Sequence, residues 1–544
     1  MRGEAGSGRE TPSSSSARRS MCSAFWRRCR QRSSRRFAFN RAFAARCRSF
    51  AAFARSRSSC SGPRRAVRGN TGRASGGLGE DGSAPVCING SNARPVIRVA
   101  YRVAQVEICA RPSALRVKVF VEAYGCTQNY GEARLMREAL RGRGHDIVEG
   151  EGDADAHVLV TCTVVETTER KMVRRMTQLA ALEKPLIVAG CMAAAQRDRV
   201  LATVPRAKLL PPRKWPQIVD LLDAGTACGD RSAEIESQSF GWHDAIVPIA
   251  QGCAGRCTYC ITRVARGRVA SDPIPAIVSQ VRRHVEQGLR EIKLTGQDTA
   301  AYGLDSGTTL AALLRAVAEI PGDFRVRVGM ADPLTVDPIC DKLVEAYASE
   351  KVFKFLHLPV QSGDDGILEA MRREYTVAAF EEIVRIFRRA HPRMMLSTDV
   401  IVGFPGETEE QFERTMDLMR RVRPDIVNVT RFSARAGTPA AGMPHPVVGW
   451  RTKERSRRLT RLRFEIAREI GEGFVGEEVE VLLTEQGKGT TVLARTPEYR
   501  QVVLPGPLPL GNFARVRIEE AHATDLRGRV LGDVSASPSP ASPP

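Results

Sequence analysis

The sequence predicts an α/β protein with three folded parts: an open parallel α/β sheet, an incomplete barrel of six βα repeats, and a small β-barrel. Three βα units begin near residue 117, six more alternate after residue 244, and only short alternating strands follow residue 473. The 544 residues, 42% hydrophobic and 26% charged, suit a soluble protein of several domains. No apolar run approaches the ~20 residues that cross a bilayer, so we expect a cytoplasmic protein without a membrane partner.

Residues 1–115 differ in composition from the rest of the chain. They hold 23 arginines, no lysine and five acidic residues, which gives +18 of the chain's net charge of +21. Three interpretations are open: a disordered arm that binds nucleic acid, a transit peptide, or an over-extended reading frame. The abrupt change in composition favours the last and predicts that the native chain starts near residues 115–119. The cysteines of this leader are then incidental: Cys22, Cys29, Cys47, Cys60, Cys87 and Cys109.

The first folded part, residues 117–225, repeats a strand that ends at a cysteine. Strand 118–124 precedes Cys126, strand 157–160 precedes Cys162, and strand 185–189 precedes Cys191. The carboxyl ends of parallel strands share one edge of a sheet, so the three cysteines are expected to converge. A single cysteine at a strand end is commonly a buried core residue. Three cysteines, each at the end of one of three parallel strands, favour a shared metal site. The linker that follows, residues 225–245, contains Cys228, which we expect to be idle.

A compact cysteine motif opens the second part, residues 239–471. Strand 245–250 leads into Cys253, Cys257 and Cys260, with the spacing C-x3-C-x2-C. Zinc would require a fourth ligand, and neither His243 nor His284 stands at ligand spacing. Three thiolates suit a [4Fe–4S] cluster with one iron left open.

The remaining barrel strands are expected at 291–294, 324–328, 353–358, 394–402 and 426–430. Polar residues gather at their carboxyl ends, where barrels of βα repeats carry their chemistry: Gln297 and Asp298, Gln361 and Ser362, and Ser397, Thr398 and Asp399. Thr408 is the expected N-cap of the next helix.

An arginine-rich helix is predicted over about 450–471. It has seven basic residues and one acidic residue between Arg451 and Arg463, although such runs are usually solvated faces. Four strands then form the predicted small β-barrel over 473–532: 478–484, 490–494, 501–504 and 514–521. RNA contact there would depend on local residues: Lys488, Arg495, Tyr499, Arg500, Arg515 and Arg517. Residues 533–544 are expected to be a disordered tail.

The order of these motifs resembles the radical S-adenosylmethionine (SAM) methylthiotransferases. Segment Tyr124–Glu132 (YGCTQNYGE) resembles the archaeal and eukaryotic branch, which acts on N6-threonylcarbamoyladenosine (t6A) at position 37 of tRNA. Segments 357–363 and 399–408 also match family blocks, and the terminal barrel resembles the TRAM RNA-binding domain. The family has a flavodoxin-like first domain. Two features depart from it: the arginine-rich leader, and the lack of the terminal membrane anchor of animal relatives.

The resemblance implies two [4Fe–4S] clusters. Cys253, Cys257 and Cys260 would hold the radical SAM cluster, whose open iron binds SAM. An auxiliary cluster carrying the sulfur would be held by Cys126, Cys162 and Cys191. One SAM would methylate that sulfur and a second would supply the radical that acts at C2 of the adenine. SAM contacts are expected from Tyr259, Gln297, Gln361 and Asp399. The partners would be the tRNA anticodon loop, an electron donor and a sulfur donor.

The sequence is less consistent with two functions of other classes. A two-cluster electron carrier would need neither a six-stranded barrel nor an RNA-type terminal domain. A zinc-dependent RNA-binding protein would lack the absorption near 400 nm of iron–sulfur clusters. Within the family, a methylthiotransferase acting on isopentenyladenosine-37 tRNA or on a ribosomal protein is the alternative.

Overall fold

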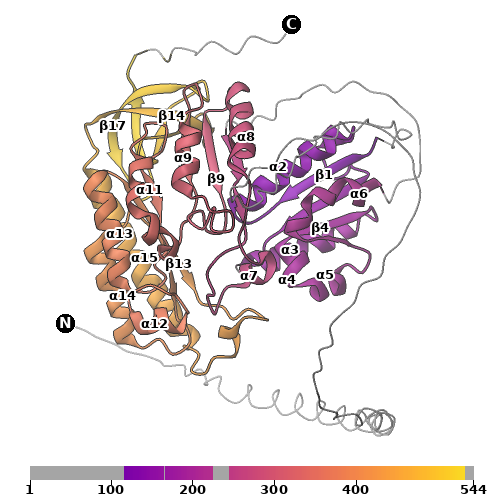
Figure 1. The fold of residues 1–544 in the computed structure, drawn as a ribbon, viewed down its shortest axis with the longest axis horizontal. Coiled ribbons are helices and arrows are strands. Elements are labelled where there is room, and N and C mark those ends of the chain that lie inside the picture. The colour runs from indigo at the N-terminus through magenta and orange to yellow at the C-terminus, as the bar shows by residue number, and fades with distance from the viewer. Residues whose placement is uncertain (1–115, 165, 224–243, 533, 535–544) are drawn as a thin grey trace, which may run out of the picture. The chain divides into compact units, whose positions relative to one another are not determined.

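The computed structural model describes residues 116–164, 166–223, 244–532 and 534. The expectations for the leader, Cys228 and the tail therefore lie outside the described residues. The described part of the chain runs from an α/β sheet through a barrel of βα repeats to a closed β-barrel (Figure 1). Within the described residues, no helix is both long and apolar enough to span a membrane.

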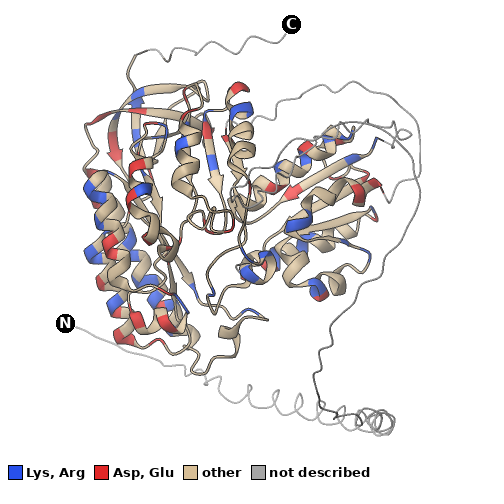
Figure 2. Cartoon of the chain, viewed as in Figure 1, with Lys and Arg blue, Asp and Glu red and all other residues tan. Residues whose placement is uncertain are grey.

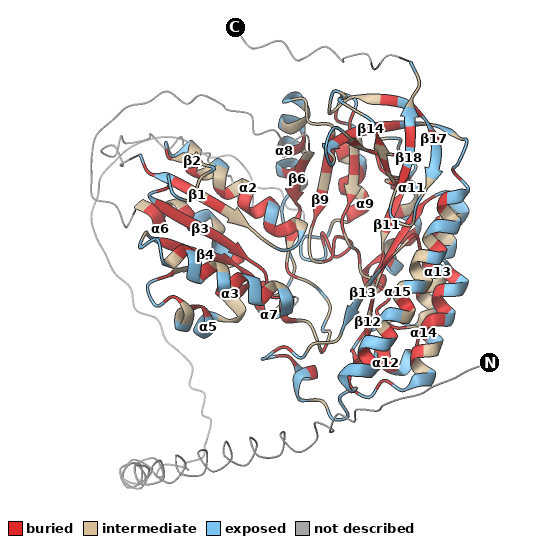
Figure 3. Ribbon diagram, turned by 180° about the vertical axis from the view of Figure 1, so that it is seen from behind, coloured by how far each residue is buried: buried red, intermediate tan, exposed pale blue. Residues whose placement is uncertain are grey.

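The first part is a parallel sheet of five strands in the order β2-β1-β3-β4-β5. The strands are β1 (Lys118–Ala123), β2 (Asp146–Val148), β3 (Ala156–Thr161), β4 (Leu186–Gly190) and β5 (Lys208–Leu210). Every residue of the central strand β3 is buried (Figure 3), because helices cover both faces of the sheet. Helices α2 (Thr127–Gly142) and α6 (Ile218–Asp223) pack on one face, and α3 (Glu166–Ala180) and α5 (Arg197–Thr203) on the other. The short strands β2 and β5 were not predicted.

The second part has the six predicted strands, in two parallel sheets of three. The sheet orders are β10-β9-β6 and β11-β12-β13. Their bounds are β6 (Asp244–Pro248), β9 (Glu291–Thr295), β10 (Arg325–Val328), β11 (Phe355–His357), β12 (Met395–Val402) and β13 (Ile426–Arg431). An isolated parallel bridge from Val326 to Val352 joins β10 to the segment before β11, and one apolar core spans both sheets. The predicted incomplete barrel is confirmed.

Helices alternate with these strands, as a βα barrel requires. They are α8 (Ile274–Glu286), α9 (Leu310–Ala318), α11 (Cys340–Tyr347), α13 (Val377–Ala390), α14 (Glu409–Val422) and α15 (Gly449–Glu472). The shorter elements are α4 (Cys191–Ala195), η1 (Pro212–Gln217), β7 (Ala250–Gln251), α7 (Ile261–Arg266), β8 (Ala270–Ser271), α10 (Pro333–Val336), η2 (Asp337–Ile339), α12 (Asp365–Ala370) and η3 (Pro439–Gly442). Thr408 caps α14 through a capping box with Gln411, which confirms the predicted N-cap.

The third part is a closed β-barrel in the order β14-β15-β16-β18-β17. Its strands are β14 (Glu478–Gln486), β15 (Val492–Arg495), β16 (Gln501–Leu504), β17 (Phe513–Ala521) and β18 (Leu526–Val530). The sequence predicted only four strands. The fifth, β18, pairs with both β17 and β16, and this closure leaves no open sheet edge.

A turn of this barrel covers the amino-terminal ends of the βα-barrel strands. The Tyr499 ring packs against Phe353 and Phe355, with ring centroids 4.9 and 5.2 Å away. Its hydroxyl donates to Glu291 over 2.7 Å, and Arg500 forms a buried ion pair with Asp425. The terminal barrel is therefore docked on the end of the βα barrel opposite to the cysteine motif.

Candidate functional site

The loop after β7 carries the compact cysteine motif. Gly252 has φ +86°, and a Cβ there would lie 2.0 Å from the carbonyl oxygen of Arg268, so only glycine fits. Its N–H donates to the side-chain oxygen of Gln297 over 2.7 Å. The N–H of Cys253 donates to the carbonyl oxygen of Gly267 over 3.2 Å. Helix α7 begins directly after Cys260. These contacts hold the loop at the carboxyl end of the barrel.

Two of the thiols face a common space. A Cβ on Gly255 would lie 3.5 Å from the sulfur of Cys253 and 3.6 Å from that of Cys257, so a glycine keeps this space clear. Burial raises the pKa of the Cys253 thiol to about 12. Burial also raises the pKa of Cys257, against the opposing charge of Arg373. A bound cation reverses this effect, because a coordinated thiol is deprotonated.

Arg373 was not found from the sequence. Its side chain, 6% exposed, donates to the sulfur of Cys257 over 3.3 Å and pairs with Asp332 at 2.6 Å. It also donates to the hydroxyl of Tyr375 over 2.9 Å. Arg373 stands far from the motif in sequence and belongs to no recognisable pattern, so only the fold brings it to Cys257.

The second cysteine triplet lies at the edge of the first sheet. Cys126, Cys162 and Cys191 follow β1, β3 and β4, as predicted. A Cβ on Gly125 would lie 2.5 Å from the Cβ of Cys162, so the first two cysteine loops are in contact. Asn129, in the first turn of α2, donates to the carbonyl oxygens of Tyr124, over 2.7 Å, and Thr161, over 3.1 Å. One amide thus holds both loops together.

The three thiols of this triplet influence one another electrostatically. Burial raises the pKa of Cys191 to about 12, with Cys126 and Cys162 adding to the effect and Arg266 opposing it. Cys162 and Cys191 are buried, whereas Cys126 is exposed. The triplet therefore has one thiol open to solvent and two enclosed.

Each triplet has the donor set that a [4Fe–4S] cluster with one open iron requires, three cysteine thiols. Among the described residues, no group of three or more His, Cys, Asp or Glu side chains is arranged to hold one metal ion. In a [4Fe–4S] cluster each cysteine binds a different iron, so the thiols need not surround a common point. Each triplet supplies three thiols, and the space beside Gly255 is clear.

Arg266 links the helix that follows the compact motif to the domain that carries the second triplet. It is the last residue of α7, 1% exposed, and pairs with both carboxylate oxygens of Glu132 on α2. It also donates to the side-chain oxygen of Asn129 over 2.8 Å. Helix α7, which begins after Cys260, packs on α4, which begins at Cys191. The second part of the chain thus contributes a buried cation to the cysteine site of the first.

The four residues expected to bind SAM all belong to the strands and loops of the βα barrel. The Tyr259 ring packs edge-on against Phe404 at 6.4 Å, and Gln297 holds Gly252. Gln361 has φ +70° and forms a parallel bridge with Val400. Asp399 accepts from Asn428 over 2.7 Å and contacts the Nε2 of His357 at 3.2 Å. Burial opposes ionisation of Asp399, yet the His357 and Asn428 contacts lower its pKa. The sequence did not predict His357 and Asn428 as partners of Asp399.

The expected RNA contacts of the terminal barrel fall into two groups. Lys488, Arg515 and Arg517 are exposed, and Arg515 pairs with Glu478 at 3.3 Å. Tyr499 and Arg500 instead contact the βα barrel, and the Arg495 guanidinium lies 4.8 Å from the Tyr499 ring centroid. The Tyr499 ring therefore packs on the βα barrel, and its expected role as a stacking surface for RNA stays a prediction. A cavity of about 390 Å³ lies between these residues and α15.

Each of the three folded parts of the chain matches a known protein family. The uncharacterized protein family UPF0004 matches residues 118–210, the radical SAM superfamily matches 247–419, and the TRAM domain matches 473–531. A probable threonylcarbamoyladenosine tRNA methylthiotransferase of Archaeoglobus fulgidus is 41% identical over 429 residues, which cover 77% of this chain and 99% of that protein.

Two further relatives come from other branches. The threonylcarbamoyladenosine tRNA methylthiotransferase of Danio rerio is 33% identical over 76% of this chain and 78% of that protein. The tRNA-2-methylthio-N(6)-dimethylallyladenosine synthase of Cereibacter sphaeroides is 34% identical over 76% of this chain and 99% of that protein. With identities above 30% over 99% of the length of the Archaeoglobus fulgidus and Cereibacter sphaeroides relatives, the chain belongs to the radical SAM tRNA methylthiotransferase family.

Proposed function

We propose that this enzyme transfers a methylthio group to C2 of t6A at position 37 of tRNA, giving the 2-methylthio derivative. The observation that carries the proposal is the pair of cysteine triplets, one on each of two domains, with Arg266 of the second domain buried beside the triplet of the first. A radical-generating site and a sulfur-carrying site must cooperate on one substrate, and one triplet would serve each of them. The relatives named for threonylcarbamoyladenosine support the choice of base.

The chain's own residues would divide the work between two [4Fe–4S] clusters. When bound, the clusters and SAM supply the radical and the sulfur, which an unreactive aromatic C–H requires. Cys253, Cys257 and Cys260 would hold one cluster, with Arg373 donating to the sulfur of Cys257. The triplet Cys126, Cys162 and Cys191 would hold the other. An electron donor, a sulfur donor and a cytoplasmic location complete the proposal.

SAM would bind at the carboxyl ends of the barrel strands. Gln297 and Gln361 both lie there, and Asp399 is held by its contacts with His357 and Asn428. A fixed carboxylate can accept hydrogen bonds from a cofactor without reorganising. Asp399→Asn should therefore raise the KM for SAM and leave the iron content nearly unchanged.

The test uses anaerobically reconstituted full-length protein, SAM and a strong reductant. It is offered tRNA carrying t6A37 and, separately, tRNA carrying isopentenyladenosine-37. Mass spectrometry of the nucleosides should show the methylthio product from t6A alone. Product only from the isopentenyl substrate would assign the activity named for the Cereibacter sphaeroides relative. No product from either tRNA, with SAM cleavage intact, would contradict tRNA methylthiolation.

A further inference from the structure

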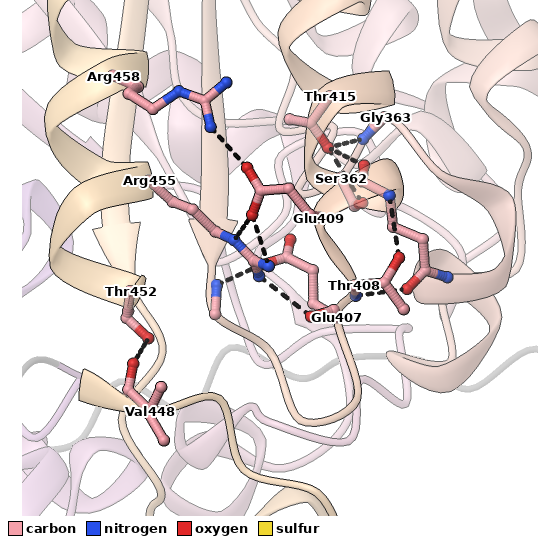
Figure 4. Close-up of polar contacts among 12 residues, drawn as sticks. Ser362, Gly363, Glu407, Thr408, Glu409, Thr415, Val448, Thr452, Arg455 and Arg458 are labelled. Carbon is pink, nitrogen blue, oxygen red and sulfur yellow. Dashed lines mark hydrogen bonds and ion pairs between the residues drawn. The ribbon is translucent and has the colours of Figure 1, made fainter. Parts of the chain in front are cut away.

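The basic residues of helix α15 divide into an inward set and an outward set. The inward set is tied to the body of the βα barrel. Arg455, with a side chain 2% exposed, pairs with Glu407 at 2.7 Å and with Glu409 at 3.0 Å (Figure 4). Arg458 pairs with Glu409 at 2.6 Å, and Arg463 donates to the carbonyl oxygen of Val427 over 2.6 Å. These three arginines fix the helix and are not available to a partner.

The outward set is exposed and unpaired. Arg451, Lys453, Arg457 and Arg461 face solvent, and none of them forms an ion pair with any residue that the structure describes. Lys453, Arg457 and Arg461 recur every four residues, so they form one stripe along about 12 Å of helix. Figure 2 shows basic and acidic residues interspersed on the helices of this side of the βα barrel, of which α14 packs on α15. The stripe is therefore a row of three cations that form no ion pair with the described residues, and the exposed Glu465 follows it one turn further along the helix.

Trp450 stands at the start of this stripe. Its side chain is 65% exposed, and the Arg451 guanidinium lies 5.2 Å from the centre of its ring. Tryptophan is usually highly buried, so an exposed ring beside a row of cations is unusual. An exposed indole offers an aromatic face on which a nucleic-acid base can stack.

The first turn of α15 lies near the cysteine motif. Thr452 packs against Gly403, where a Cβ would lie 2.5 Å from the Thr452 hydroxyl (Figure 4 shows Thr452 on the first turn). Gly403 donates its N–H to Glu407 over 2.6 Å, and Glu407 in turn binds Arg455. Phe404, the next residue, packs against Tyr259 of the cysteine loop. Trp450 is therefore on the same end of the barrel as the proposed chemistry.

We propose that Trp450 stacks on an unpaired base of the substrate RNA, close to the reacting nucleotide, while Arg451, Lys453, Arg457 and Arg461 bind its phosphates. The proposal rests on the proposed function for the identity of the RNA. The chemistry suits unpaired nucleotides rather than a duplex, because a base must be unstacked to meet an aromatic side chain. The free cations complement the phosphates, and their affinity depends on salt.

The first experiment measures binding of an anticodon stem–loop to full-length reconstituted protein. Trp450→Ala should weaken binding about 5-fold to 100-fold, as loss of one stacked base does, whereas Trp450→Phe should keep most of the affinity. Val475→Ala is the matched control, because Val475 is also exposed but lies beyond the other end of α15. 5′-Deoxyadenosine formation without RNA should be the same in all four proteins, which excludes misfolding.

The second experiment tests the stripe. Arg457→Glu with Arg461→Glu should lower the slope of log affinity against log salt by about 1.4, since each contact with a single strand contributes about 0.7. The matched control is Arg282→Glu with Arg283→Glu, two exposed arginines on α8.

A third experiment identifies the stacked base with stem–loops that each lack one base. When the missing base is the stacking partner of Trp450, the stem–loop should bind wild type and Trp450→Ala with equal affinity.

The outcomes separate the two proposals. Unchanged RNA affinity in Trp450→Ala would contradict the proposal that this surface of α15 binds RNA. Equal losses of RNA affinity in the control variants would contradict it too. Neither result would count against methylthiolation. An abasic scan in which every position weakens both proteins by the same factor would also overturn the stacking role. Failure of the wild-type protein to make product would count against the proposed function, whatever the binding results.

Discussion

The two cysteine triplets reach similar donor sets by different routes. Cys253, Cys257 and Cys260 lie within eight residues on one loop, which hydrogen bonds to Gly267, Gln297 and Met371 hold in place. Cys126, Cys162 and Cys191 come from three strand ends, and the parallel order of β1, β3 and β4 brings them together. The compact site depends on local geometry, whereas the dispersed site depends on the whole sheet.

The triplets also differ in how they are completed. Arg373, at Cys257, belongs to the same domain as its cysteine. Arg266, near Cys191, comes from the other domain and is bound there by Glu132 and Asn129. The dispersed site should therefore be sensitive to docking between the domains.

Removing the dispersed triplet should have the largest effect. The triple variant Cys126→Ala, Cys162→Ala, Cys191→Ala should form no methylthio product, because the sulfur would have no site. It should still convert SAM to 5′-deoxyadenosine under strong reductant, since the compact loop is untouched. Nucleoside mass spectrometry and chromatography of 5′-deoxyadenosine measure the two activities. Product from this variant would refute a sulfur path through that triplet.

Single cysteine variants should separate the iron content of the two sites. Reconstituted wild-type protein should hold about eight irons, four for each cluster. Cys253→Ala and Cys126→Ala should each lose about half of them, as measured by iron assay and by absorption near 400 nm. Cys340→Ala is the control, because Cys340 is buried in the apolar core of the barrel. Full iron content in either ligand variant would show that its cysteine is not a ligand.

Breaking the link between the sites should cost stability. Arg266→Ala leaves the carboxylate of Glu132 buried without its partner, and losing one side of a buried ion pair costs about 3–5 kcal/mol. Arg170→Ala, which breaks the exposed pair with Glu166, should change the unfolding free energy by less than about 1 kcal/mol. Denaturant unfolding of the protein without iron measures both. Similar small losses would mean that Arg266 does not hold the domains together.

The smallest expected effect concerns the space between two thiols. Gly255→Ala would place a methyl group 3.5 Å from the sulfur of Cys253 and 3.6 Å from that of Cys257, at ordinary contact distance. We expect nearly normal folding with faster iron loss on exposure to a chelator. Gly307→Ala serves as a control in open space, although its φ of +75° adds strain of its own. Equal iron retention in all three proteins would show that the cluster does not use this space.

Removal of the terminal barrel is a poor test of RNA binding in this protein. Tyr499 and Arg500 cover the amino-terminal ends of the barrel strands, so truncation near residue 471 would also expose Phe353 and Phe355 and leave Asp425 unpaired. Point variants on the exposed surface avoid this problem.

Local patterns in the sequence determined much of this protein. The six barrel strands, the cysteine loop, the cap at Thr408 and the convergence of three cysteines at one sheet edge all follow from spacing and periodicity, which local chain geometry enforces. Strands β2, β5 and β18 escaped prediction. The first two have three residues each and little pattern, and β18 contains two arginines and a glycine.

Only the tertiary structure decided which distant side chains meet. Arg373 reaches Cys257, Arg266 reaches the site of another domain, and Tyr499 turns inward although its sequence context suggested a surface ring. The same holds for α15, where one run of basic residues splits into buried anchors and a free stripe beside Trp450. Contacts between residues far apart in the chain depend on how whole elements pack, and no local spacing records that packing.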